Sequence, residues 1–535
     1  MKQTGKRLLS ILLFVLLFTQ PLCLSLAAEE NGMRTPTVYI VGQGYELVDN
    51  AGNTIYNITA TLPSDTYIQD QAKKLVPLLA AGILTQRFER FSSALLEALE
   101  PVYAPLRPNK DGTVTDGSHA AWTYSEESLA AVSPDANGEY ALDAFQMYWD
   151  WRLDPVEVAG QLDAYIDAVL AATGASKINL VSRCLGSSVA LSYVTLYGTE
   201  KIRGLFFFSP TCFGNTFCGQ IFAGKLNLDP SAIERYVSER FSGFGDGMLS
   251  EPVTVALLRE TVRLLVETHQ LDLHAVITKH NFEKIKALVY GDALLASYGS
   301  FASYWSMVDE ENYAAARRLA FAGKEAEYAA FLQKIDFYHY EIQQKLPQTL
   351  RALQKQGLPI GNLSKYGFQM IPLLEDSSRV GDEMLDLYAS GFGITTPPGG
   401  AALSQTYCDR LAAAGKQAYL SPDFLADVST AVLPDTTWVV KDLPHRLFPA
   451  SCDRLMAAFL RSGSLTADTD PAYPRFLKYD AQTDTLLPLT ADNAAADPQP
   501  HGALAAIRAF LQALGAFLRH YIQQMLIKSF LLWYN

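Results

Sequence analysis

The chain has 535 residues, 49% of them hydrophobic and 19% charged, with a formal net charge of −13 at pH 7. This length allows a large core plus an added module. The acidic balance excludes a protein that binds nucleic acid through a broad basic surface, because phosphate binding requires clustered lysine and arginine. We find no phosphate-binding loop, metal-ligand cluster, internal repeat or dinucleotide fingerprint, and no pattern that requires a cofactor.

The first 27 residues have the pattern of a secretory signal peptide. Three basic residues precede the apolar run 8–18, and small residues follow at 25–27. The apolar run is shorter than a membrane-spanning helix requires. We therefore expect an exported protein, secreted or held in the cell envelope on the outer face of the cytoplasmic membrane. Without residues 1–27, 40 basic and 56 acidic residues remain, a formal charge of −16.

Buried strands alternate with helices over the next part of the chain. Residues 37–41 and the start of 145–155 predict apolar strands, and residues 156–173 predict an amphipathic helix that ends at Gly174. This alternation is typical of a buried parallel sheet covered by helices.

Residues 177–188, KINLVSRCLGSS, predict an apolar strand, a sharp turn and the start of a helix. They match the nucleophile elbow G-x-S-x-G, with Ser182 at the first small position and Cys184 at the nucleophile position. A helix N-terminus favours the thiolate, which is the attacking form of cysteine. The elbow therefore predicts a cysteine-based acyl-transfer enzyme, and the alternative is an ordinary buried thiol. Residues 202–209 predict the next strand.

Residues 148–155, YWDWRLDP, together with the following helix and the elbow, resemble the lecithin–cholesterol acyltransferase-like, lipase-like branch of the α/β-hydrolases. That branch typically has a Y-D-W-R-L-x-P run and an elbow of the form G-H-S-L-G. The resemblance covers about residues 140–200 and is patchy over 35–50 and 365–460. It implies an α/β-hydrolase fold, a mostly parallel sheet flanked by helices, with lipase, phospholipase or acyltransferase chemistry on an apolar acyl ester or lipid.

This sequence departs from the family pattern at the elbow. Cys184 replaces the nucleophilic serine, Ser182 replaces glycine, and Arg183 stands where histidine is common. These departures leave open a second function, a catalytically inactive envelope protein that binds lipid or a protein partner. For the active enzyme, the fold implies oxyanion donors after the first core strand and just after the nucleophile, which we assign to the backbone of Gln43 or Gly44 and of Leu185.

Residues 212–350 differ in character from the predicted core. Helical patterns dominate there, glycine and proline are sparse after about residue 253, and aromatic residues are frequent. Lipase-like hydrolases carry a helical insertion at this point that covers the site, so we expect a helical cap suited to an apolar substrate. The alternative is a helical subdomain that packs its own core. The expected α/β core is then formed by residues 28–211 and 351–461. The expected helices are 253–269, 282–290, 312–331 and 337–354.

In this fold the acid and the histidine follow the nucleophile in chain order. Residues 366–373 predict the strand before the acid, and Asp382 best matches the family's acid stretch, although Glu383 replaces its glycine. Asp427 is the alternate acid, and Asp376 and Asp386 are weaker candidates.

His445 lies in a loop between a predicted strand, 437–440, and a final helix, where this fold has its base. The alternative is a histidine on a surface loop. We therefore expect a triad of Cys184, Asp382 and His445, which forms a thioester acyl-enzyme and passes the acyl group to water or an alcohol.

Five cysteines remain without residues 1–27, so at least one is unpaired in an oxidising compartment. We expect Cys184 to be free, with Cys212–Cys218 and Cys408–Cys452 as candidate bridges.

The last segment, 462–535, contains polar linkers, a small hairpin over 476–489 and an amphipathic helix over 504–533. Basic side chains on that helix favour the membrane surface, and the alternative is docking on the protein body or a second subunit.

Overall fold

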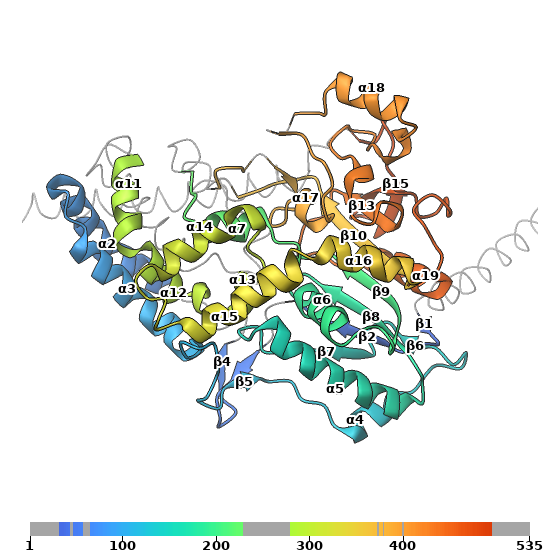
Figure 1. Cartoon of the computed structure of the whole chain (residues 1–535), viewed down its shortest axis with the longest axis horizontal. Coiled ribbons are helices and arrows are strands. Elements are labelled where there is room, and N and C mark those ends of the chain that lie inside the picture. Colours follow the sequence, from blue (N-terminus) through green and yellow to red (C-terminus); the bar gives the residue numbers. More distant parts are fainter. Residues whose placement is uncertain are drawn as a thin grey trace, which may run out of the picture.

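The computed structural model describes residues 32–42, 46–56, 65–227, 279–371, 374–377, 379–398 and 401–494. Its centre is an eight-stranded sheet in the order β15-β14-β13-β10-β9-β8-β2-β7 (Figure 1). Neighbouring strands are parallel except for the terminal pair β14–β15. The predicted α/β class with a mostly parallel sheet is therefore confirmed. The strands of this sheet are β2 (Thr37–Ile40), β7 (Phe145–Met147), β8 (Ile178–Arg183), β9 (Ile202–Phe208), β10 (Ile360–Tyr366), β13 (Thr437–Lys441), β14 (Phe476–Asp480) and β15 (Thr485–Pro488).

Helices cover both faces of the sheet. Successive strand residues alternate between two cores: Leu180 packs in the core shared with α5 (Pro155–Thr173) and α6 (Gly186–Leu196), and Val181 in the core shared with α19 (Ala450–Ser462). Helix α5 begins with Asp154 capping its N-terminus, and it ends at Gly174, whose φ of +69° forms a left-handed cap. The period-two pattern of the strands thus fixes which face each helix covers.

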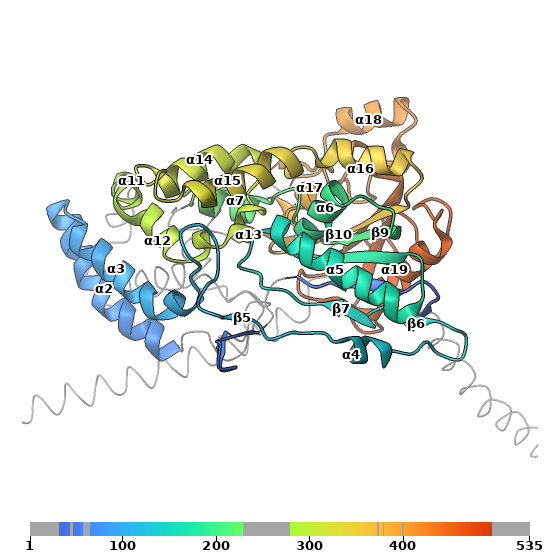
Figure 2. The ribbon, with the colours of Figure 1, turned by 60° about the horizontal axis from the view of Figure 1, so that its bottom comes forward.

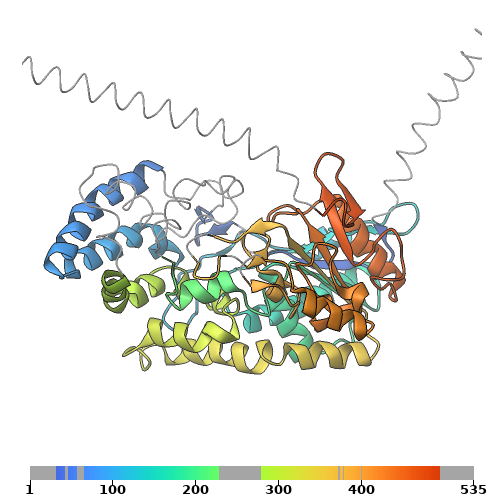
Figure 3. The same ribbon diagram turned by 90° about the horizontal axis from the view of Figure 1, so that it is seen from above.

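A second, all-helical region lies beside the sheet, and we call it the helical part (Figures 2 and 3). Two chain segments build it, because α3 packs against α12 and the Arg107 guanidinium donates to the carbonyl of Ala296 at 2.9 Å. Residues 65–106, which we expected within the α/β core, lie in this helical part together with residues from 212–350. Its helices are α2 (Asp65–Thr85), α3 (Glu89–Tyr103), α7 (Thr216–Phe222), α11 (Lys279–Ile285), α12 (Gly291–Leu295), α13 (Ala302–Trp305), α14 (Glu310–Phe321) and α15 (Ala329–Phe337), with short turns η2 (Ala104–Leu106), η4 (Lys286–Tyr290) and η5 (Tyr298–Ser300).

The expected long helices are shorter in the structure. The helix expected over 312–331 is broken, since α14 ends at Phe321 and α15 starts at Ala329, and Gly323 between them has a φ of +76°. The helix expected over 337–354 consists of η6 (Tyr338–Gln343), a π-helical segment, and α16 (Leu346–Lys355). The helix expected over 253–269 lies outside the described residues.

The strand before the acid is β10, which ends at Tyr366, so the expectation of a strand over 366–373 is wrong. Polar residues hid this strand from the hydrophobic pattern: Asn362, Ser364 and Lys365 all lie in it and are fully buried. The amide of Asn362 and the hydroxyl of Ser364 both donate to the carbonyl of Ser390, at 3.1 and 2.7 Å, which makes their burial possible.

The C-terminal hairpin is part of the main sheet. Strand β14 pairs in parallel with β13, with Val439 opposite Phe476, and β15 returns antiparallel to it. The α/β core therefore extends through β15, beyond the boundary at residue 461 that we expected. Residues 1–27 and 504–533, which carry the expected signal peptide and amphipathic helix, lie outside the described residues.

The remaining described elements are short, and their strands form three small sheets of their own, β1–β6, β11–β12 and β4–β3–β5. No helix in the described part of the chain combines the length and the apolar character needed to cross a membrane. These elements are β1 (Gly32–Met33), β3 (Leu47–Val48), β4 (Thr54–Tyr56), β5 (His119–Ala120), α4 (Glu126–Ala130), β6 (Tyr140–Ala141), β11 (Phe368–Gln369), β12 (Val380–Gly381), α17 (Leu387–Ser390), α18 (Gln405–Ala413), η8 (Gln417–Tyr419), η9 (Val428–Thr430) and η10 (Pro434–Thr436).

Candidate active site

Cys184 lies on a sharp turn between β8 and α6. Its φ of +48° is in the left-handed region, which a non-glycine residue occupies only when the surrounding structure forces it. Its backbone N–H donates to the carbonyl of Phe208 at 3.2 Å, which holds the turn against β9. A Cβ at Gly186 would lie 2.5 Å from the carbonyl oxygen of Val41, so the helix can approach β2 only with glycine there. This is the backbone geometry of a nucleophile elbow.

Of the five cysteines in the described residues, Cys184 is the one that is not buried. All five are free, so the bridges Cys212–Cys218 and Cys408–Cys452 that we considered are not formed. Burial raises the pKa of the Cys212 thiol to about 12 and also raises the pKa values of Cys218 and Cys452, which makes these thiols unreactive. The accessible thiol is therefore the one on the strained turn.

Asp382 and His445 form a buried pair at the carboxyl ends of β10 and β13. His445 Nδ1 donates to Asp382 Oδ2 at 2.9 Å, and the backbone N–H of His445 donates to the Asp382 carbonyl at 3.0 Å. The other carboxylate oxygen accepts the backbone N–H groups of Met384 and Leu385, at 3.2 and 2.8 Å. With exposures of 0% for Asp382 and 1% for His445, the carboxylate fixes both the orientation and the tautomer of the ring.

The charges of this pair are set by each other and by Cys184. Burial alone would lower the pKa of His445, but the Asp382 carboxylate, followed by Cys184, raises it to about 9. Burial would likewise raise the pKa of Asp382, yet the charge and hydrogen bond of His445 hold it below its usual value. Cys184 therefore lies close enough to the His445 ring to influence its pKa. A histidine beside a thiol can accept the thiol proton, so this arrangement is one that can activate a cysteine nucleophile.

The structure thus brings Cys184, Asp382 and His445 together, and it places the alternate acids elsewhere. Asp427 accepts the Tyr407 hydroxyl at 2.7 Å and caps η9, with no contact to the histidine. Asp386 caps α17 and accepts the backbone N–H of Thr216 at 2.8 Å. The third candidate, Asp376, pairs with Arg379.

The expected oxyanion donors are only partly within the described residues. Leu185 is the first residue after Cys184, and within the described residues nothing accepts its backbone N–H. Gln43 and Gly44 lie outside the described residues. Their neighbour Gly42 lies against the elbow, because a Cβ added to it would be 3.1 Å from the Cβ of Cys184. Gly42 therefore lies directly beside Cys184.

The acid loop carries a second, unusual residue. Glu383 has a φ of +85°, a left-handed conformation that favours glycine, and it is buried. Burial, together with the neighbouring Asp382 charge, raises the pKa of Glu383 to about 7. Glu383 therefore places both backbone strain and a buried carboxyl beside Asp382.

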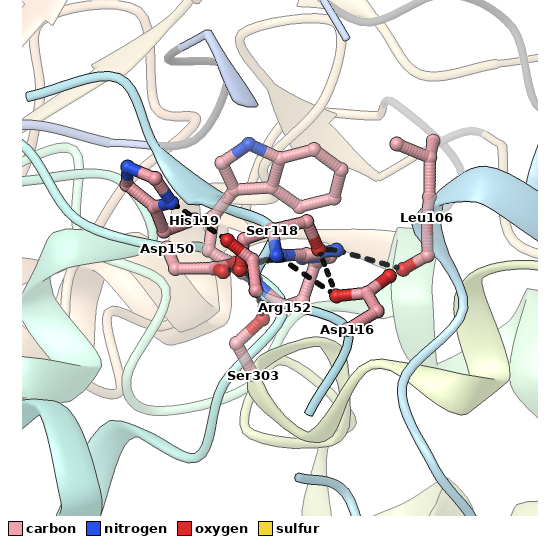
Figure 4. Close-up of polar contacts among 9 residues, drawn as sticks. Leu106, Asp116, Ser118, His119, Asp150, Arg152 and Ser303 are labelled. Carbon is pink, nitrogen blue, oxygen red and sulfur yellow. Dashed lines mark hydrogen bonds and ion pairs between the residues drawn. The ribbon is translucent and has the colours of Figure 1, made fainter. Parts of the chain in front are cut away.

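Residues 148–155, YWDWRLDP, supply none of the three triad side chains, and they fasten the helical part to the sheet (Figure 4). The buried Arg152 guanidinium donates twice to Asp150, at 2.9 and 2.6 Å, and once to the Ser118 hydroxyl at 3.1 Å. The Arg152 carbonyl accepts the backbone N–H of Ala302 at 3.0 Å. The carbonyl of Trp151 accepts the hydroxyl of Ser303. The segment that carries the resemblance is therefore structural.

Sequence reasoning missed Lys365, a fully buried lysine directly behind His445. Its signal was an isolated charge: Lys365 is the one charged residue in 356–374, and we had not assigned residues 356–365 to a strand. Within the described residues, no group of histidine, cysteine and acidic side chains could hold a metal ion.

Comparison with known proteins finds distant structural matches. No protein-family model matches the chain, and no curated protein matches its sequence. Among solved structures, a chain from the crystal structure of the Tle4–Tli4 complex aligns with 62% of this chain and 75% of its own length, with a TM-score of 0.23 and 12% identity. We therefore infer function from the geometry of the chain itself.

Proposed function

We propose that this protein is an α/β-hydrolase of the lipase-like branch that cleaves or transfers an acyl ester with Cys184 as nucleophile, His445 as base and Asp382 as the acid that orients it. The observation that carries the proposal is the accessible thiol on a strained strand-to-helix turn beside a buried His–Asp pair. The order of the strands supports it, because nucleophile, acid and histidine follow β8, β10 and β13 along one edge of a parallel sheet.

In the proposed mechanism the Cys184 thiolate attacks the ester carbonyl. The backbone N–H of Leu185, together with a donor from the segment after Gly42, stabilises the oxyanion. The His445 imidazolium donates its proton to the departing alkoxide. The acyl group stays bound to the sulfur of Cys184 as a thioester. His445 then takes a proton from water or an acceptor alcohol, and the deprotonated oxygen attacks the thioester. This attack releases the Cys184 thiolate and leaves the proton on the His445 imidazole.

An apolar substrate fits the surroundings of the site. Phe213, in the loop after β9, packs against the same hydrophobic core as Cys184 and against Tyr388 of α17, whose side chain is 45% exposed. The helical part reaches the elbow as well, since the Ser306 hydroxyl donates to the Ser188 hydroxyl in the first turn of α6 at 2.8 Å. These contacts support a role for the helical part as a cap over an acyl chain.

The second candidate is a catalytically inactive protein that binds lipid or a protein partner. The observation that favours it is Glu383, which adds strain and a buried carboxyl next to the acid. Strain and an extra carboxyl beside Asp382 would hinder catalysis, whereas a protein that only binds a partner would tolerate them.

Hydrolysis of p-nitrophenyl esters of increasing acyl length tests the proposal against this alternative. We expect an initial burst of p-nitrophenol that approaches one equivalent of enzyme and vanishes in Cys184→Ala. Cys408→Ala is the matched control, because Cys408 is also a free thiol but is buried in α18. Release that is absent, or equal in Cys184→Ala, would refute the nucleophile and favour the binding protein. The acyl length with the highest kcat/KM would report the size of the acyl site.

Two further parts of the proposal rest on the sequence alone. We propose export through residues 1–27, which N-terminal sequencing of the protein recovered outside the cytoplasm would test: a terminus at or near residue 28 is expected. We also propose that residues 504–533 bind the membrane surface. Deleting them should abolish cosedimentation with anionic phospholipid vesicles, and unchanged cosedimentation would contradict this role.

A further inference from the structure

Lys365 is a fully buried lysine in the central sheet, one residue before the end of β10. Lysine is almost never fully buried unless its charge is paired or hydrogen bonded, because removing an ammonium group from water is costly. Burial lowers the pKa of Lys365 to about 8, although the nearby Asp382 carboxylate opposes this shift. A hydrophobic side chain would fill the same space without that cost, so the position calls for an explanation.

The contacts of Lys365 lead to the histidine loop. Its Nζ donates to the backbone carbonyls of Pro444 at 3.1 Å, His445 at 2.6 Å and Leu447 at 3.1 Å. An ammonium group has three donors, and here all three are used within one stretch of four residues. The loop has no regular secondary structure of its own, so these bonds define the path of its backbone.

The same ammonium group also meets the aromatic ring that closes the loop. Lys365 Nζ lies 4.2 Å from the centroid of the Phe448 ring, and the guanidinium carbon of Arg183 lies 3.4 Å from the same centroid. Arg183 is the residue directly before Cys184, and Phe208 of the intervening strand packs edge-on against the ring at 5.0 Å. Phe448 therefore connects the histidine loop to the elbow, because the cations of Lys365 and Arg183 both contact its ring.

We propose that Lys365 is a positioning residue for the proposed catalytic histidine: by holding three carbonyls of residues 444–447 and the Phe448 ring, it keeps His445 at the distance from Cys184 that proton transfer requires. The inference rests on the proposed function. Asp382 accepts from both Nδ1 and the backbone N–H of His445, whereas Lys365 donates to the carbonyls of the same loop, so the two residues hold different atoms of it. Supporting groups of this kind matter because a displacement of about 1 Å can cost about 100-fold in rate.

The test measures the rate of Cys184 alkylation by iodoacetamide between pH 5 and 9 in the full-length protein, and it needs no substrate. In the wild type we expect rapid alkylation at pH 6, and slow alkylation in His445→Ala, because the imidazolium stabilises the thiolate. Lys365→Met keeps an unbranched apolar side chain, one atom shorter than lysine, but removes the three donors. We expect it to alkylate about 10- to 100-fold more slowly at pH 6, and to lower kcat for ester hydrolysis by a similar factor with KM unchanged.

Lys441→Met is the matched control. Lys441 is a buried lysine on the neighbouring strand β13, where it pairs with Asp423 at 2.8 Å and has no contact with the carbonyls of 444–447. We expect this variant to lose thermal stability and to keep the wild-type alkylation profile. A Lys365→Met protein that melts lower but alkylates like the wild type would overturn the proposal and leave Lys365 with a structural role.

Two outcomes separate this inference from the proposed function. Alkylation that is equal in the wild type and His445→Ala would refute the Cys–His pair itself. Alkylation that depends on His445 but not on Lys365 would refute only the positioning role. Lys365→Gln replaces Lys365→Met if the latter does not fold, since its amide retains part of the donor capacity: slowed alkylation that is less severe than in His445→Ala supports the proposal, and a wild-type rate overturns it.

Discussion

The charge interaction between Asp382 and His445 predicts how the stability of the protein depends on pH. His445 has its ordinary pKa of 6.5 in the unfolded chain and a pKa raised to about 9 in the folded protein, where the Asp382 charge outweighs burial. Below pH 6.5 both states hold the proton, and the full stabilisation is present. As the pH rises from 6.5 to 9, the unfolded chain releases the proton before the folded protein does, so the free energy of unfolding falls.

The gap between the two pKa values corresponds to about 3 kcal/mol of stabilisation. Asp382→Asn removes the charge but keeps the size of the side chain and an oxygen for Nδ1. Burial then dominates and lowers the pKa of His445, so the loss of stability over this range should disappear. The difference in unfolding free energy between wild type and Asp382→Asn should therefore shrink by about 3 kcal/mol from pH 6.5 to pH 9.

Urea unfolding followed by tryptophan fluorescence at pH 6.5, 7.5 and 9 measures this difference. Asp427→Asn is the matched control: Asp427 is also fully buried but contacts Tyr407 rather than His445. Its difference from the wild type should stay constant over the same range. A constant difference for Asp382→Asn as well would refute the assignment of the buried charge pair.

Further predictions concern the elbow, the thiols, the alternate acid and the Arg152 cluster. Gly186→Ala should lower the unfolding free energy by about 1–3 kcal/mol, because its Cβ would overlap the carbonyl oxygen of Val41. A urea midpoint equal to that of the wild type would contradict this close packing. Titration with a chromogenic disulfide reagent should find one fast thiol in the native protein, absent in Cys184→Ala, and the buried thiols only after unfolding; a slow Cys184 would contradict its exposure. Asp427→Asn should leave ester hydrolysis unchanged, and a loss of kcat would restore it as the acid. Arg152→Met should lower the unfolding free energy by about 3–5 kcal/mol, because it leaves Asp150 buried without its partner, and a loss below 1 kcal/mol in urea unfolding would contradict the role of this pair.

The parts of the fold with a strong local signal could be predicted from the sequence. Strand β8, the turn at Cys184 and helix α6 follow from an apolar run that meets a small-residue turn, and α5 follows from its Asp–Pro start and its terminal Gly174. The strand and loop before His445 were predicted for the same reason. In each case the residues that decide the structure are neighbours in the sequence.

What could not be predicted depends on contacts between distant segments. Strand β10 contains Asn362, Ser364 and Lys365, whose burial is possible only because Ser390 and the histidine loop supply acceptors. The joining of residues 65–106 to the helical part likewise depends on bonds such as that from Arg107 to Ala296. Patterns of hydrophobic residues carry no information about the acceptors of a buried polar strand or about contacts between distant helices. The position of Lys365 behind His445 was therefore found only in the structure.

The most direct test of the proposed mechanism is mass spectrometry of the protein quenched in acid during turnover of a p-nitrophenyl ester. A thioester is stable in acid, so the intermediate can be located by peptide mapping. The mechanism predicts that the peptide with Cys184 gains the mass of the acyl group less one hydrogen, and that the mass gain builds up with the burst and is absent in Cys184→Ala. Turnover without an acyl group on Cys184, or with the acyl group on another residue, would contradict it.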